Sequence, residues 1–122
     1  MTRPLLILVE SDPVLREAFQ AVAQACGHDL TVFGSLGEAI GTAAPQPGDT
    51  LVVDLAVWTD FEQLVAWRAG LPATPPTLVL TDQPPGLFLR RWGTVDGVEI
   101  LRKPIEAAAL VSLLNAAAGK AT

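Results

Sequence analysis

The sequence contains little of what marks several large classes of protein. Its 122 residues include one cysteine, Cys26, so an internal disulfide is excluded. The apolar stretch within the N-terminal MTRPLLILVESD is too short for a signal peptide or a membrane span. Basic residues form no long block, and the formal net charge of −5 disfavours non-specific contact with nucleic-acid phosphates. We therefore expect a cytoplasmic protein with no direct nucleic-acid partner and no membrane contact.

The chain is rich in apolar residues. Half of the residues are hydrophobic and 17% are charged, a balance that suits one soluble domain with a full core. We find no internal repeat and no linker that would divide the chain. The prediction is a single domain over residues 1–122.

Strand and helix patterns alternate along this domain. Short apolar runs predict strands at 5–9, 29–33, 50–56, 77–82 and 97–101, and helical spacing or capping signals predict helices from 12 to 27, from 35 to 45, from 59 to 70, over 87–92 and over 105–119. The first helix has Asp12 as its cap, Pro13 at its first position and Gly27 at its end. The alternation predicts an α/β fold, a doubly wound five-stranded parallel sheet of flavodoxin-like type with helices on both faces.

Polar residues follow four of the predicted strands. Because ligands of open parallel sheets bind outside the carboxyl ends of the strands, these residues should share one rim. They are Glu10, Ser11, Asp12, Asp54, Thr81, Asp82, Lys103 and Pro104. A carboxylate can accept a phosphoryl group there, while a hydroxyl and an ammonium bind phosphate oxygens.

The stretches LLILVESDPVLREAF, LVVDLA, LVLTD and ILRKPI stand in the order and approximate spacing of receiver domains of two-component response regulators. The chain resembles a free-standing receiver over nearly its whole length. The resemblance implies that Asp54 is the phosphoacceptor position, that Thr81 supplies the hydroxyl that shifts toward the phosphoryl group, and that Lys103 binds it. It also implies a cis bond before Pro104.

Magnesium is the cofactor that the resemblance implies, held by Glu10, Asp54 and the backbone carbonyl of Ala56. Ser11 takes the place of the second acid that normally follows the first strand, so it is the weak member of the set. A hydroxyl contributes no negative charge, and Mg²⁺ favours carboxylates. The sequence therefore predicts weak or absent magnesium binding.

Three further positions depart from the family pattern. Asp82 stands where a small residue is usual, Trp58 where proline is common, and Ile100 where an aromatic often acts as a rotameric switch. Asp82 either obstructs or repels a phosphoryl donor or supplies the charge that Ser11 lacks, and the sequence leaves both alternatives open.

The stretch GLFLRRWG combines large apolar residues with two arginines. Because Trp and Arg are enriched at binding hot spots, Phe88, Arg90, Arg91 and Trp92 are candidates for an interface. The alternative is that Phe88 and Trp92 only cover the sheet. In receivers this region is the usual output and dimer surface.

Two functions follow from these features. In the first, the chain is a receiver in two-component signalling or a phosphorelay: a histidine kinase or phosphotransfer protein donates a phosphoryl group to Asp54, and the domain catalyses that transfer and the later hydrolysis. Its other partners would be a downstream protein or a second copy of the chain. In the second, the chain is a pseudo-receiver that acts by protein contacts without phosphorylation.

A dehalogenase-type phosphatase is disfavoured because Ala56 stands where that family needs a second aspartate, and a flavodoxin-like cofactor site because ESDP lacks a phosphate loop.

Overall fold

The protein is described from a computed structural model, which covers residues 5–55, 60–106, 108–109, 111–112 and 115. Its strands are β1 (Leu5–Val9), β2 (Asp29–Phe33), β3 (Thr50–Asp54), β4 (Thr77–Thr81) and β5 (Val98–Arg102). Its helices are α1 (Pro13–Ala25), α2 (Leu36–Thr42), α3 (Asp60–Ala69) and α4 (Pro85–Trp92). No helix within the described ranges is both long enough and apolar enough to span a lipid bilayer.

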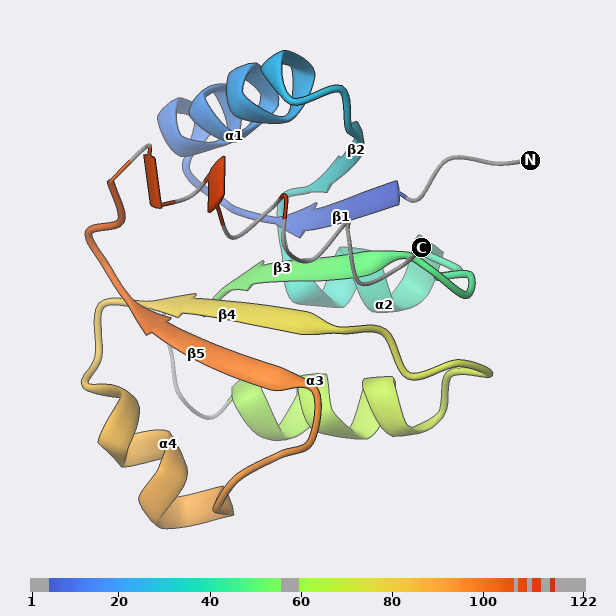
Figure 1. Cartoon of the computed structure of the whole chain (residues 1–122). Helices are drawn as coiled ribbons and strands as arrows, with labels where there is room; N and C mark the ends of the chain where they lie inside the picture. The colour runs from blue at the N-terminus through green and yellow to red at the C-terminus, as the bar shows by residue number, and fades with distance from the viewer. Residues whose placement is uncertain (1–4, 56–59, 107, 110, 113–114, 116–122) are drawn as a thin grey trace.

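The five strands form one parallel sheet in the order β2-β1-β3-β4-β5 (Figure 1). Val9 of β1 is in register with Val53 of β3, and Asp54 is in register with Leu80 of β4. Thr81 in turn pairs with Arg102 of β5. The strands therefore end together at one edge, as expected for a doubly wound sheet.

Helices cover both faces of the sheet. On one face, Phe19 and Ala23 of α1 pack against Leu6, Leu8, Val52, Leu78 and Leu80. On the other, α2, α3 and α4 contribute Leu36, Phe61, Leu64 and Phe88 to a core with Ile7, Val9, Leu51, Val53 and Val79. Burial from two sides explains why the central strands are continuous apolar runs rather than alternating ones.

The predicted helix signals have structural counterparts at α1 and α2. The Asp12 carboxylate accepts from the Val14 amide at 2.9 Å, and Pro13 is the first helical residue. Gly27 has φ +75°, which allows its amide to donate to Gln24 and that of His28 to Ala23 as the helix ends. At α2 the Ser35 hydroxyl accepts from the Glu38 amide at 3.1 Å.

The predicted strands and the first four helices are confirmed: the strands at 5–9 and 29–33 have the predicted bounds, and the bounds of the other elements differ by at most three residues. The predicted helix over 105–119 falls largely outside the described residues, as does residue 59, the predicted start of the third helix.

Candidate functional site

The site lies at the carboxyl edge of the sheet. Glu10 follows β1, Asp54 is the last residue of β3, Thr81 is the last residue of β4, and Lys103 follows β5. These four strands are consecutive neighbours in the sheet, so four residues spread over 94 positions of the chain meet at one edge. The predicted convergence of carboxylate, hydroxyl and ammonium is thus present.

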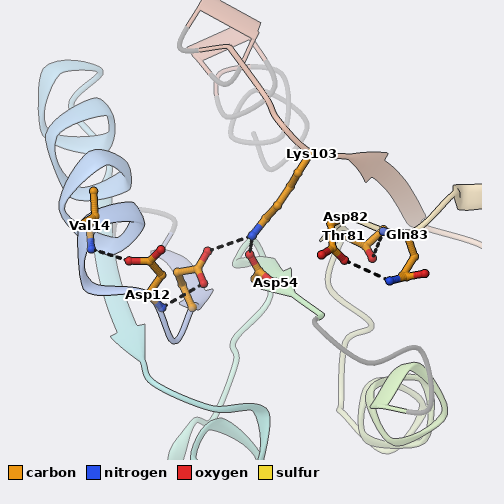
Figure 2. A network of polar contacts seen from close by, with 8 residues as sticks. Asp12, Val14, Asp54, Thr81, Asp82, Gln83 and Lys103 are labelled. Atoms are coloured by element: carbon orange, nitrogen blue, oxygen red, sulfur yellow. Dashed lines mark hydrogen bonds and ion pairs between the residues drawn. The ribbon is translucent and has the colours of Figure 1, made fainter.

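Lys103 is the centre of the charge arrangement. Its ammonium forms an ion pair with Oδ2 of Asp54 and lies 3.7 Å from Oε1 of Glu10. In Figure 2 the Lys103 side chain extends to Asp54, with Asp12 on one side of this pair and Thr81 and Asp82 on the other. Two carboxylates thus share one cation.

Burial makes that cation necessary. Glu10 is 2% exposed, and the Asp54 side chain is 11% exposed. Within the described residues, neither Oε1 of Glu10 nor Oδ2 of Asp54 has a hydrogen-bond partner. A buried carboxylate is costly unless it is paired, so these oxygens depend on the Lys103 ammonium.

Thr81 connects the site to the loop before α4. It is fully buried, and its hydroxyl accepts from the Gln83 amide at 3.1 Å. Its carbonyl accepts from the Lys103 amide at 2.7 Å, which ties β4 to the residue that carries the ammonium. Movement of the Thr81 hydroxyl would therefore require Gln83 to give up this bond.

Asp82 follows Thr81 at the start of this loop. It is exposed, and its Oδ1 accepts from the Gln83 side-chain amide at 3.5 Å, at the limit of a hydrogen bond. Within the described residues, no ion pair joins Asp82 to Lys103. Both sequence-based alternatives for Asp82 remain predictions.

The loop after β1 places its three polar residues, Glu10, Ser11 and Asp12, in different surroundings. The Asp12 amide donates to Oε2 of Glu10 at 3.2 Å, while the Asp12 carboxylate caps α1. Ser11 between them is exposed. The acid that remains in this loop beside Glu10 is thus already engaged in stabilising a helix.

The donor set for a dication is correspondingly small. Among the described residues, no group of three His, Cys, Asp or Glu side chains is placed to hold a metal ion. Glu10 and Asp54 do offer two carboxylates around one point, with lone pairs that no hydrogen bond uses. The predicted carbonyl ligand of Ala56 and the predicted neighbour Trp58 lie outside the described residues. Glu10 and Asp54 are therefore the two described side chains that could contact a magnesium ion at this edge of the sheet, and no third described acid joins them.

The candidate interface on α4 needs a correction. Phe88 is fully buried and Trp92 is half-buried, and both rings pack on Phe61 of α3, with ring centroids 5.3 and 5.0 Å away. Phe88 is therefore a core residue and not part of a surface. The exposed apolar residues of this helix are Leu87 (38%) and Leu89 (51%), and Arg90 and Arg91 are also exposed.

Two features of the site gave no signal in the sequence. One is Gln83, whose amide holds the Thr81 hydroxyl. The other is an apolar groove of about 480 Å³ beside Lys103, lined by Leu15, Ala18, Phe19, Val22, Leu80, Asp82, Pro104 and Ile105. The cis Lys103–Pro104 bond, by contrast, is the one that the resemblance implied.

Comparison with known proteins places the fold. The sequence matches no protein-family model and no curated protein. In three dimensions, a response regulator receiver domain protein from Bacillus halodurans matches with a TM-score of 0.74 and 19% identity, over 95% of this chain and 97% of that one. Chemotaxis protein CheY4 of Vibrio cholerae matches with a TM-score of 0.72 and 21% identity, over 95% and 99% of the two chains.

A third solved structure carries a metal. The receiver domain of a sensor histidine kinase from Pseudomonas aeruginosa, with a magnesium ion coordinated in its active-site cleft, has a TM-score of 0.69 and 20% identity, over 97% of this chain and 99% of that one. The chain thus has the flavodoxin-like α/β fold of response regulator receiver domains.

Proposed function

We propose that the protein is a receiver-like domain of two-component signal transduction, in which Asp54 is the phosphoacceptor position and magnesium-dependent phosphorylation is weakened by Ser11. The observation that carries the proposal is the arrangement of Asp54, Lys103 and Thr81 at the ends of three adjacent strands. The solved receiver domains with the same fold support it.

Each of these residues has a chemical role in phosphoryl transfer. A carboxylate oxygen of Asp54 attacks the phosphorus of a phosphohistidine or a small phosphoryl donor, and the leaving group departs with the bonding electron pair. Lys103 pairs with a phosphoryl oxygen, and the Thr81 hydroxyl, whose oxygen accepts from the Gln83 amide, donates its proton to another. Hydrolysis of the acyl phosphate by water returns Asp54 to its starting state.

Magnesium supplies the remaining positive charge when it is bound, and Glu10, Asp54 and the Ala56 carbonyl would hold it. Glu10 and Asp54 carry two negative charges against the single charge of Lys103, so the described site stays net negative as an anionic donor approaches. With Ser11 in place of an acid, the site attracts a dication less strongly.

The exposed position of Ser11 and the helix-capping role of Asp12 favour a second candidate, a pseudo-receiver that keeps the fold and signals by protein contacts alone. Its contact surface would be the exposed residues of α4. In either case the proposed setting is the cytoplasm, and the partners are a histidine kinase or phosphotransfer protein and a downstream protein.

Calorimetric titration with Mg²⁺ tests whether Asp54 is part of the metal site in the first proposal. The wild type should bind weakly, and Asp54→Asn, which removes one of the two carboxylates, should bind more weakly still. If the wild type binds Mg²⁺ measurably and Asp54→Asn binds it equally well, Asp54 is not part of the metal site and the proposed chemistry fails.

A further inference from the structure

Arg68 lies in the last turn of α3, at the edge of the sheet opposite Asp54, and is 4% exposed. An arginine is almost never buried to this degree unless its guanidinium is paired. The described contacts of this guanidinium are with backbone carbonyls of two loops that are far apart in the sequence. The role of Arg68 therefore depends on the parts of the structure that these two loops connect.

The first loop, 70–76, leads from α3 to β4. Nε and Nη2 of Arg68 both donate to the Pro75 carbonyl, at 3.2 and 3.0 Å. The second loop, 93–97, leads from α4 to β5, and Nη1 donates to the Asp96 carbonyl at 3.2 Å. One side chain thus joins the end of α3 to the segment that follows α4. Burial lowers the pKa of the guanidinium from its ordinary value, and the negative charge of Asp96 opposes that shift.

The conformation and small size of Gly97 allow the loop to approach the Arg68 guanidinium. Its φ is +76°, and a Cβ at this position would lie 2.7 Å from Nη2 of Arg68. Its carbonyl accepts from the Thr77 amide at 2.9 Å, so the loop is also tied to the first residue of β4. Both the backbone conformation and the absence of a side chain are needed for the loop to approach Arg68 this closely.

The same helix holds α4 at a second point. Phe61, two turns before Arg68 in α3, packs on the rings of Phe88 and Trp92 in α4. Helix α3 therefore contacts α4 through the ring of Phe61, and it contacts the loop after α4 through the guanidinium of Arg68. In Figure 1, α3 and α4 lie beside β4 and β5, and the loop 93–97 runs from the end of α4 to the start of β5.

We propose that Arg68 is a positioning residue that clamps the α4–β5 loop to the end of α3, so that α3 and α4 form one unit and the exposed face of α4 is held in one place on the sheet. The importance of that face rests on the proposed function. The clamp itself does not, and it is tested without a partner, a metal or a phosphoryl donor.

Amide hydrogen exchange of the intact chain measures directly how firmly Arg68 holds the α4–β5 loop. In Arg68→Met the Pro75 and Asp96 carbonyls lose their guanidinium donors, so amides in 93–97 and α4 should exchange about tenfold faster or more than in the wild type. Amides of β1 and β3, which the clamp does not touch, should change only by the common shift in global stability. Unchanged exchange in 93–97 and α4, or a uniform rise over the whole chain, would overturn the clamp.

A double-mutant cycle gives a second test, in which the effect of a substitution at Gly97 is compared in the wild-type and the Arg68→Met backgrounds. Gly97→Ala should increase exchange in 93–97 strongly in the wild-type background because its methyl group meets Nη2, and less in the Arg68→Met background. Gly93→Ala is the matched control: it has φ +66° in the same loop, but a Cβ there meets nothing within 4 Å. Its effect should be equal in both backgrounds. If Gly97→Ala is also background-independent, Gly97 does not act through Arg68 and the proposal fails.

Discussion

The ammonium of Lys103 pairs with the Asp54 carboxylate while lying 3.7 Å from Oε1 of Glu10, so one cation serves two buried acids. The arrangement leaves one negative charge uncompensated among these three residues. In water this would matter little, but Glu10 is 2% exposed, and charges interact more strongly where solvent is excluded. The site is therefore sensitive to any change in its charge count.

Removal of the shared cation should destabilise the fold. In Lys103→Met the buried oxygens of Glu10 and Asp54 lose their counter-charge, and we expect a loss of about 2 kcal/mol in unfolding free energy, less than for a fully buried pair because Lys103 is partly exposed. Urea denaturation measures it. Adding Asp54→Asn should recover part of the loss, since one of the two unpaired charges is then gone. A double variant that is less stable than Lys103→Met would contradict this reading of the pair.

Restoring an acid after Glu10 should strengthen metal binding. Ser11→Asp adds one negative charge near the two carboxylates, and Mg²⁺ affinity measured by calorimetry should rise about tenfold or more. Ser11→Asn is the matched control because it has nearly the same size without the charge, and it should bind like the wild type. If the wild type already binds Mg²⁺ as tightly as Ser11→Asp, then Asp82 or Asp12 compensates for the serine. Ser11 is exposed, so neither variant should lose much stability.

The sequence predicted the sheet well for a physical reason. Strands buried on both faces, such as Leu5–Val9 and Thr50–Asp54, are continuous apolar runs, and a run that stops at a polar residue marks the carboxyl edge. Because that edge is shared by all parallel strands, the sequence alone predicts that Asp54, Thr81 and Lys103 lie close together. The capping roles of Asp12 and Ser35 depend on neighbouring residues alone and were equally accessible.

What the sequence could not give was the direction in which side chains of α4 and α3 point. In α4 the adjacent residues Leu87, Phe88 and Leu89 are all apolar, and only packing on Phe61 decides that Phe88 is buried and the leucines are exposed. Arg68 lies between Trp67 and Ala69 at the end of α3, and neither neighbour indicates which groups the guanidinium contacts in the fold. Its partners, Pro75 and Asp96, belong to loops that meet it only in the folded chain.

The corrected surface of α4 should separate binding from stability. Leu89→Ser combined with Arg90→Ala changes exposed positions, so it should weaken partner capture or self-association while unfolding free energy stays within about 0.5 kcal/mol. Phe88→Ala should instead cost about 3–5 kcal/mol, the size expected for a buried aromatic. Sedimentation and thermal denaturation on the two variants check both statements. Unimpaired binding by the stable surface variant would remove α4 from the interface.

A small cavity beside Ile100 allows a test of the space left where the family often carries an aromatic. The cavity is about 100 Å³ and is also lined by Phe61, Leu89 and Val98. Ile100→Phe should fill part of it and stabilise the fold by about 0.5–1 kcal/mol. Val79→Phe is the contrasting variant, because Val79 is fully buried in the packed core and should lose about 1–3 kcal/mol on enlargement. Equal losses for both variants would show that the cavity does not accept a ring.

Phosphoryl transfer to Asp54 is the most direct measurement, followed by intact-mass spectrometry with acetyl phosphate and Mg²⁺. The wild type should gain one phosphoryl group slowly or not at all. Ser11 adds no negative charge to the site, so the site should attract Mg²⁺ weakly, and without Mg²⁺ the acidic site repels the anionic donor. Ser11→Asp should be labelled faster, with Asp82→Ala added to it faster still if Asp82 repels the donor, and Asp54→Asn should abolish all labelling. Rapid and complete labelling of the wild type would contradict the weakened switch, and labelling that survives Asp54→Asn would contradict the site itself.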